Sequence, residues 1–430
     1  MSLSLIGILV GLAVLITLAM RGWHIILLAP LAASIVCIFS DLNILENLTG
    51  PYMEGFITYA KKYYLIFLGA SLFAKYMDDS GAAKRIAMFI LSKVDKSKPY
   101  RMLIAIWVIT SVLTYGGVNL WVVAFVLIPI TLPIFKEMNI AWHLSLAPFM
   151  LGLGTATMTM LPGTPAIQNI MPTKLLGTTA TAAPLIGIVS SVIVTALGLF
   201  YIRYALNRSL AKQEVFVQPK NITMGNDRES NLPSLLMSVL PPVTLIVVLN
   251  VFKVSIEYTL FGATFLCMAL FHRHVKSHLE TLNQGAINSV MPVINTCADV
   301  GFGRVVAATS GFQVALNGLM NIPGNPIIAM AIAVNLLAAI TSSGSGGLGI
   351  ALDTIIPKFV EMGINPEVIH RIASMSCGGL DTMPHNGAVI TILAVFGLLH
   401  KEGYKHMFAT CVAAPLLTLV PAIAMAILLY

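Results

Sequence analysis

The sequence predicts an all-α polytopic membrane protein, made of two repeats of inverted topology with broken helices and re-entrant hairpins. Two observations predict this fold class. First, 57% of the 430 residues are hydrophobic and only 10% are charged, whereas soluble domains carry about 25% charged residues. Second, short motifs recur about 230 residues apart. Backbone polar groups need internal partners in lipid, and the apolar runs do not alternate as barrel strands do, so we expect helices.

Apolar runs follow one another along the whole chain, and runs of roughly 20 residues are long enough to cross a bilayer as helices. Several runs are shorter, and we expect those to form half-helices or re-entrant hairpins. The expected segments are Leu3–Met20, Ile25–Phe39, Tyr64–Met77, Met102–Tyr115, Leu120–Phe135, Leu144–Met160, Ala182–Tyr201, Leu235–Phe252, Thr259–Phe271, Val290–Ala308, Ile327–Ile340, Leu348–Phe359, Val368–Leu380, Ala388–Leu399 and Phe408–Leu429.

The first run has no basic residue before it, and the first positive charge, Arg21, follows it. We therefore expect an uncleaved first helix with its N-terminus outside the cell. The net charge of +7 comes from residues in short connecting segments. That distribution sets orientation in a membrane and argues against a nucleic-acid partner. The cysteines lie in or beside apolar segments without metal-ligand spacing, so we expect no metal site.

The duplication is seen in matched motifs. Ala183-Pro184-Leu185 is repeated as Ala414-Pro415-Leu416, an offset of 231 (415 − 184), and Asp79-Ser80-Gly81 resembles Thr309-Ser310-Gly311, an offset of 230 (310 − 80). The predicted organisation is therefore a first repeat over residues 1–203, a linker over 204–231 and a second repeat over 232–430.

Charges in the connections predict that the repeats are inverted. The expected loop 78–101 and the linker are rich in Lys and Arg, so we place both inside the cell. The counterpart of loop 78–101 is the expected loop 311–326, which contains no charged residue. Matching connections on opposite sides of the membrane give inverted topology, an arrangement typical of secondary transporters.

Each half interrupts its apolar helices twice with Gly, Pro, Ser, Thr and Asn. Irregular backbone at membrane depth is tolerated where it faces protein or a polar cavity, and the helix N-termini beside it suit a carboxylate. The alternative is that these are turns at the membrane surface. The candidate substrate-binding residues at the interruptions are Thr114, Gly116, Gly117, Asn119, Pro162, Gly163, Thr164, Ser343, Ser345, Gly346, His385 and Asn386.

Asp381 and His385 form an ionisable pair within a membrane segment, and we expect them to bind the coupling ion. Alternatively, Asp381 caps a helix and His385 lies at the interface. Lys75 and Arg304 occupy nearly matching positions of the repeat (304 − 75 = 229). Either would counter an anionic substrate, although a snorkelling lysine explains Lys75 equally well. Asp299 is a candidate partner for that arginine, although a spacing of five residues on a helix makes the contact awkward.

The residues above resemble the gluconate permease family of carboxylate–proton symporters, in the ion transporter superfamily. The resemblance covers nearly the whole chain. It is carried by residues 67–75, by Asp79–Ala87, by Pro162-Gly163-Thr164-Pro165-Ala166-Ile167 and by His385-Asn386-Gly387.

The chain departs from the gluconate pattern at three places, one of which is the second-half Ser-His-Val-Asn-Asp-Pro-Gly pattern, where this chain has Thr382-Met383-Pro384-His385-Asn386-Gly387. Tyr115-Gly116-Gly117 lacks the acid of the corresponding gluconate motif, and Leu161 replaces the histidine that precedes Pro-Gly there. Fewer polar groups favour a substrate with fewer hydroxyls than a sugar acid. The sequence is more similar to the branch of D-β-hydroxybutyrate permeases.

The resemblance implies a permease for a small hydroxy acid such as 3-hydroxybutyrate, in a bacterial inner membrane. It also implies a scaffold and a transport domain, a homodimer, elevator-like alternating access and proton symport without a bound cofactor. Sodium coupling, a gluconate-type substrate and an uncoupled facilitator stay open as alternatives. A membrane enzyme is disfavoured, because no nucleophile elbow or metal-ligand motif is present.

Overall fold

The chain folds as an assembly of helices in the computed structural model, which describes residues 3–21, 23–95, 97–219, 232–320, 324–341, 343–384 and 386–430. No strand occurs in these ranges. Four helices within them are long and apolar enough to cross a membrane: Leu120–Glu137, Pro184–Ala211, His278–Ala307 and His400–Leu429. The all-α prediction is confirmed.

Two long helices, α4 (Met53–Asp79) and α13 (His278–Ala307), pack against each other and form the frame of the molecule. Each is flanked by a helical pair. α2 (Ile25–Phe39) packs on α13 and α1 (Leu3–Met20) packs on α2, while α12 (Ile256–Leu270) packs on α4 and α11 (Leu235–Asn250) packs on α12. The same pairwise packing therefore occurs twice.

The crossing of α4 and α13 depends on a matched pair of glycines. A Cβ added at Gly55 would lie 2.6 Å from Cγ of Arg304, and one added at Gly285 would lie 3.4 Å from Cβ of Lys75. The two glycines are 230 residues apart (285 − 55). The two basic residues that they face, Lys75 and Arg304, are 229 residues apart (304 − 75). Small residues let helices approach closely within a membrane.

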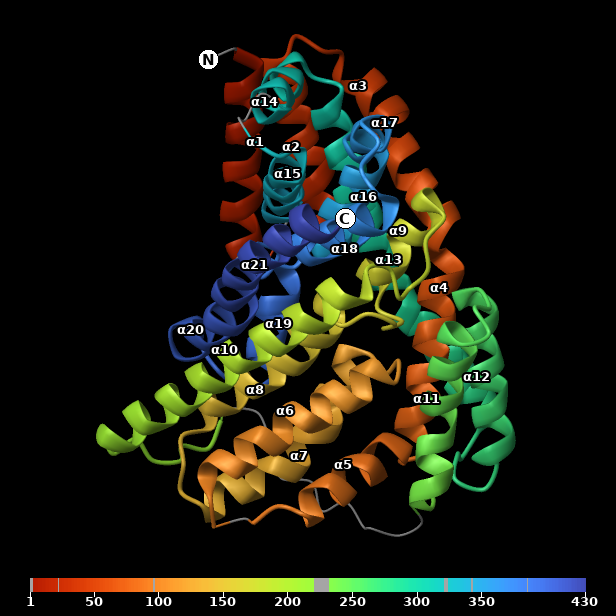
Figure 1. Ribbon diagram of the computed structural model, residues 1–430, viewed down its shortest axis with the longest axis vertical. Coiled ribbons are helices and arrows are strands. Elements are labelled where there is room, and N and C mark those ends of the chain that lie inside the picture. The colour runs from red at the N-terminus through yellow and green to blue at the C-terminus, as the bar shows by residue number, and fades with distance from the viewer. Residues whose placement is uncertain are drawn as a thin grey trace.

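Each half contributes a helical hairpin. Hairpin 1 consists of α6 (Pro99–Tyr115) and α7 (Leu120–Glu137); hairpin 2 consists of α15 (Pro326–Thr341), α16 (Gly344–Thr354) and α17 (Ile356–Glu361). Figure 1 shows hairpin 2 near α1 and α2 at one end of the molecule, and hairpin 1 with α5 (Ala82–Ser92) at the other end. Opposite placement is what inverted repeats require.

Each half also contains a helix that stops and restarts. In break 1, α8 (Leu146–Leu151) and the π-helical segment Gly152–Met160 (η3) end before Pro162, and α9 (Ile167–Leu176) follows. In break 2, α18 (Pro366–Cys377) ends at Gly378 and α19 (Gly387–Val395) follows. Proline removes a ladder donor and glycine weakens the helix, which explains why the interruptions fall there.

The remaining elements close the structure. α10 (Pro184–Ala211) packs along α21 (Ala414–Leu429), and both begin within the matched Ala-Pro-Leu motif (Figure 1). The other short elements are α3 (Ile44–Asn47), η1 (Leu48–Tyr52), η2 (Trp142–Ser145), α14 (Ser310–Met320), α20 (His400–Phe408) and η4 (Ala409–Ala413).

Three segments predicted as loops are wholly or partly helical. Residues 78–101 contain α5, residues 311–326 contain most of α14, and α10 continues through the start of the predicted linker to Ala211. In α5, Ala82, Ala83 and Ile86 are buried while Lys84 and Arg85 lie on the outer side. The loop prediction was wrong because an amphipathic helix has a low mean hydropathy although one of its faces is buried.

Candidate functional site

The tip of hairpin 1 contacts break 1. Oγ1 of Thr114 lies 2.6 Å from Oγ1 of Thr157, and the hydroxyl of Tyr115 donates to the carbonyl of Pro162 at 3.2 Å. Asn250, at the end of α11, donates from Nδ2 to the carbonyl of Gly163 at 2.8 Å. Thr164 is fully buried and its Oγ1 accepts from the amide of Ala166. The first cluster of candidate residues therefore forms one connected polar region.

The two breaks meet each other. A Cβ on Gly378 would lie 2.7 Å from Cγ2 of Thr159, so the end of η3 lies directly against the start of break 2. Thr159 and Asp381 are 222 residues apart, which is the offset between Pro162 and Pro384. The end of break 1's π-helical segment and the start of break 2, one from each half, are thus in direct contact.

The tip of hairpin 2 contacts break 2. A Cβ on Gly344 would lie 2.8 Å from Oδ2 of Asp381, whose residue is 6% exposed. Thr382 donates to the other carboxylate oxygen of Asp381 at 2.8 Å. Asn386 donates from Nδ2 to the Asp381 carbonyl at 2.7 Å and caps α19 by accepting from the amide of Ala388. Asp381 has no ion pair among the described residues.

The serines of hairpin 2 organise the start of α16. Oγ of Ser343 accepts from the amide of Gly346 at 3.1 Å, which caps the helix, and lies 3.5 Å from Oγ of Ser345. Asn119 does the equivalent for α7, since its Oδ1 accepts from the amide of Val122 at 3.0 Å. Four helices, α7, α9, α16 and α19, therefore begin at the tips and breaks.

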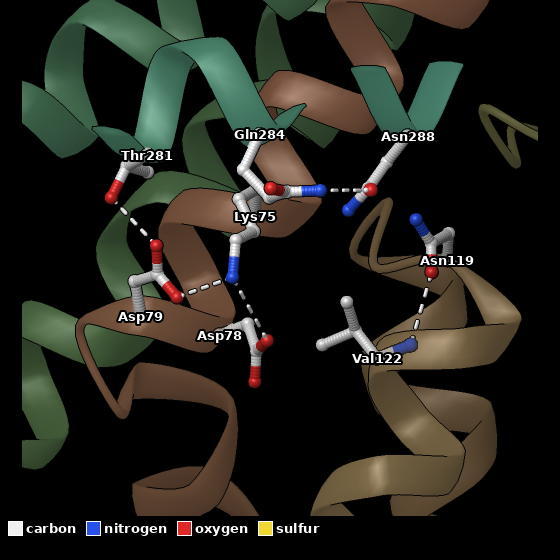
Figure 2. A network of polar contacts seen from close by, with 8 residues as sticks. All are labelled: Lys75, Asp78, Asp79, Asn119, Val122, Thr281, Gln284 and Asn288. Atoms are coloured by element: carbon white, nitrogen blue, oxygen red, sulfur yellow. Dashed lines mark hydrogen bonds and ion pairs between the residues drawn. The ribbon is translucent and has the colours of Figure 1, made fainter. Parts of the chain in front are cut away.

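Lys75 is already paired within the frame. Its Nζ lies 2.6 Å from Oδ1 of Asp79 and 3.8 Å from Oδ2 of Asp78, and Thr281 of α13 donates to Asp79 at 2.6 Å. Figure 2 shows this group beside Gln284, Asn288 and the hairpin 1 residue Asn119, with no interaction drawn between Asn119 and the group. Lys75 thus pairs within α4, and Asp79 connects this group to α13 through Thr281.

Arg304 is also paired. Its Nη2 lies 3.4 Å from Oδ2 of Asp353 in hairpin 2, and Nζ of Lys62 lies 2.9 Å from Oδ1 of the same carboxylate. A cavity of about 400 Å³ adjoins this group and is also lined by Glu54 and Lys358. Asp299 does not form the ion pair with Arg304 that the sequence suggested, because Asp353 occupies the guanidinium instead. Arg304 lies outside the junction of tips and breaks.

Arg371 is the functional-site residue that the sequence reasoning missed. It is fully buried in α18, where Nε and Nη2 donate to the carbonyl of Ala182 and Nη1 donates to Oδ1 of Asn169. Nη2 also reaches the carbonyl of Ala180. Arg371 therefore fixes the α9–α10 connection, and break 1 with it, to the helix that precedes break 2. An arginine inside the apolar run Val368–Leu380 was the signal that could have identified it.

His385 lies outside the described residues, so the structure does not locate that candidate. Within the described ranges, no group of three or more His, Cys, Asp or Glu side chains could hold a metal ion. All five cysteines are buried and unpaired.

A family model of citrate transporters, CitMHS, matches residues 2–284, which is more than half of the chain. The chain belongs to this family. It therefore belongs to the ion transporter superfamily, and it is a multi-pass membrane permease rather than an enzyme.

Two further proteins are similar over nearly the full length. The uncharacterized transporter YxjC of Bacillus subtilis (strain 168) is 32% identical over 453 aligned residues, which cover 95% of each protein. The crystal structure of the Alcanivorax borkumensis YdaH transporter matches with a TM-score of 0.56 at 14% identity, covering 87% of this chain and 88% of that one. The latter likeness concerns the fold alone.

Proposed function

We propose that this protein is a secondary active carrier for a small hydroxy-carboxylate, with 3-hydroxybutyrate as the first substrate to test, and that it is driven by proton symport. The observation that carries the proposal is the convergence of α7, α9, α16 and α19, whose N-termini begin at contacting tips and breaks. Helix N-termini present amide donors and a partial positive charge, which favour a carboxylate.

The coupling proton is assigned to Asp381, together with His385. Asp381 is buried at the junction without a cationic partner in the described part of the chain, and it lies against the tip of hairpin 2. A buried acid of this kind is stable when protonated or when it holds a cation. Transport of one proton with a monocarboxylate is electroneutral.

Access alternates, in this proposal, when both hairpins, both breaks, α10 and α21 move as a transport domain against the scaffold built on α4 and α13. The two repeats are assigned to residues 1–203 and 232–430, joined by the linker 204–231, and the carrier works as a homodimer in the bacterial inner membrane. The resemblance to gluconate permeases supports the dimer. Chemical crosslinking of the purified protein that yields only monomers would contradict this assembly.

Citrate is the second candidate substrate, because the family model that matches the chain describes citrate transporters. The small number of charged side chains at the junction favours a monocarboxylate. Arg304 and Lys75, the basic residues that the sequence suggested, are both occupied by aspartates elsewhere in the fold.

The test is uptake into proteoliposomes. Labelled 3-hydroxybutyrate, gluconate and citrate are offered under an inward proton gradient, under an inward sodium gradient, and under each gradient after it has been collapsed with an ionophore. We expect proton-driven accumulation of 3-hydroxybutyrate. Accumulation driven by sodium alone would contradict proton coupling, and equilibration without accumulation would indicate a facilitator. Accumulation of citrate or gluconate alone would contradict the assigned substrate.

A further inference from the structure

The tip of hairpin 2 packs closely against α13 through small residues. A Cβ on Gly346 would lie 3.0 Å from Cβ of Asp299, and one on Gly349 would lie 3.2 Å from Cγ2 of Val300. From the other side, Gly303 faces the side chain of Ile350. The contact therefore holds the tip directly over Asp299.

Asp299 is buried without a partner. The residue is 6% exposed, and no hydrogen bond or ion pair to its carboxylate is found in the described part of the chain. The nearest basic residue on the same helix, Arg304, is paired with Asp353. In the described part of the chain, no basic side chain therefore neutralises the carboxylate of Asp299.

The groups that surround Asp299 do not supply a positive charge either. The titratable neighbours that interact with it are an η1 tyrosine, an α4 tyrosine and a cysteine of its own helix: Tyr52, Tyr59 and Cys297. α2, which also packs on α13, contributes the buried Cys37, and α16 contributes Asp353, which is paired with Lys62 and Arg304. A carboxylate in such surroundings is tolerated only as the neutral acid or with a bound cation.

The fold itself does not require an acid at this position. The residues 230 and 229 positions earlier, on α4, are Gly69 and Ala70. Gly69 packs against Leu260 of α12, with a Cβ position 2.9 Å from that side chain. The equivalent place in the first half is therefore filled by apolar contacts, and Asp299 is a feature of the second half alone.

We propose that Asp299 is a second proton-binding site of the transport cycle, distinct from Asp381, and that it lies on the frame rather than on the moving parts. This inference rests on the proposed function, in which hairpin 2 moves relative to α13. When the tip covers Asp299, the carboxyl group holds a proton. The proton binds from the outer water before the tip closes over Asp299 and dissociates to the inner water when the tip leaves in the inward-facing state, so each cycle carries one proton across the membrane.

The consequence is one additional positive charge per substrate. Each such charge couples transport to the membrane potential by roughly 2.3 kcal/mol per 100 mV. With Asp381 carrying the first proton, symport of a monocarboxylate becomes electrogenic.

The experiment compares wild type with Asp299→Asn in proteoliposomes in which a potassium gradient with valinomycin sets the potential. We expect an inside-negative potential to stimulate wild-type uptake, and the charge moved per substrate to fall by one in the variant, while uptake driven by the proton gradient and substrate counterflow persist. Glu280→Gln, an exposed acid on the same helix, is the matched control and keeps the wild-type charge ratio. An unchanged ratio in Asp299→Asn would overturn the proposal, as would a change in sodium rather than proton dependence.

A second measurement does not need a substrate. Infrared spectra of the purified wild type at neutral pH should contain a protonated-carboxyl component, in addition to that of Asp381, which is lost in Asp299→Asn. If the two spectra agree in this region, Asp299 is ionised and the proposal is wrong. If this component is present but no carboxylate is transported, the proposed function fails and the proton site stands.

Discussion

The tips of the two hairpins have the same construction but different surroundings. In hairpin 1, a Cβ on Gly116 would lie 2.7 Å from Cβ of Pro242, and one on Gly117 would lie 3.1 Å from Cδ1 of Leu245. In hairpin 2, the glycines at the tip face Asp381 on one side and Asp299 on the other. An inverted repeat thus duplicates the backbone, while the carboxylates that suit ion coupling occur in one copy. The following changes test that contrast, from the largest expected effect to the smallest.

Gly347→Ala should destabilise hairpin 2 most strongly. The new Cβ would overlap the backbone N and Cα of Ala338, which cannot move aside as a side chain does. We expect a loss at or above the upper end of the roughly 1–3 kcal/mol seen for overpacking, measured as a fall in thermal stability of the purified protein.

Two matched variants calibrate that result. Gly117→Ala in hairpin 1 meets only side chains but has a φ of +88°, so it should cost about 1–2 kcal/mol. Gly318→Ala in α14 has open space around it and should be neutral or stabilising. Equal losses in Gly347→Ala and Gly117→Ala would mean that the two tips are equally tightly packed.

Asp381→Asn should lower proton-driven accumulation by about tenfold or more, the equivalent of about 1.4 kcal/mol. The amide keeps the shape of the side chain and its contact with Thr382, but it cannot release a proton. The equivalent residue in the first half, Thr159, has a hydroxyl that donates to the carbonyl of Thr155, so Thr159→Val should cost about 1 kcal/mol of stability and leave the pH dependence of uptake unchanged. A Thr159 variant that alters this pH dependence would show that both halves take part in coupling.

Removing the helix caps at the two tips should give equal losses of stability but unequal losses of function. Ser343 caps α16 and Asn119 caps α7, so replacing either by Ala should cost about 1 kcal/mol. Ser343→Ala should raise the KM for the transported carboxylate more than Asn119→Ala does, because its tip lies at the buried acids. Uptake kinetics and melting curves separate the two quantities, and an equal rise in KM in the two variants would contradict this difference between the tips.

Asp353→Asn should loosen hairpin 2 on the frame by a small amount. Its carboxylate joins Lys62 of α4 and Arg304 of α13, and a partly exposed ion pair is worth roughly 0–1 kcal/mol and weakens with salt. The melting temperature should fall slightly at low salt, and the difference from wild type should shrink at high salt. Asp95→Asn, which alters local contacts with Ser97, Lys98 and Arg101, is the control and should not change the susceptibility of hairpin 2 to proteases, whereas Asp353→Asn should raise it.

The smallest expected effect concerns Glu214, at the start of the linker that follows the first half. The Ser209 hydroxyl, with His143 adding to its effect, lowers the pKa of Glu214 from its ordinary value of 4.5. A carboxyl group with a lowered pKa stabilises the folded state above that value and loses its contribution as the pH falls through the lowered pKa. Proteolysis of the linker should therefore be faster in acid than at neutral pH for wild type. For Glu214→Gln the rate of cleavage should be the same in acid and at neutral pH.

Much of the fold could be predicted because the signals are local. Hydropathy predicted the helices, and the Gly and Pro residues around Pro162 and Pro384 predicted where they break. The inversion was readable from loop charges, because the rule for lysine and arginine acts on short connecting segments. The amphipathic α5 and α14 were read as loops, since their buried faces exist only in contact with neighbouring helices.

The sequence by itself determined the helical, duplicated and interrupted character of this protein, because composition, period and offset are properties of the chain. Only the tertiary structure decided which polar residues meet. It paired Lys75 and Arg304 with aspartates away from the breaks, placed Arg371 between the two breaks, and buried Asp299 beneath a hairpin tip. Such pairings depend on distances between segments far apart in the chain, and no local pattern contains them.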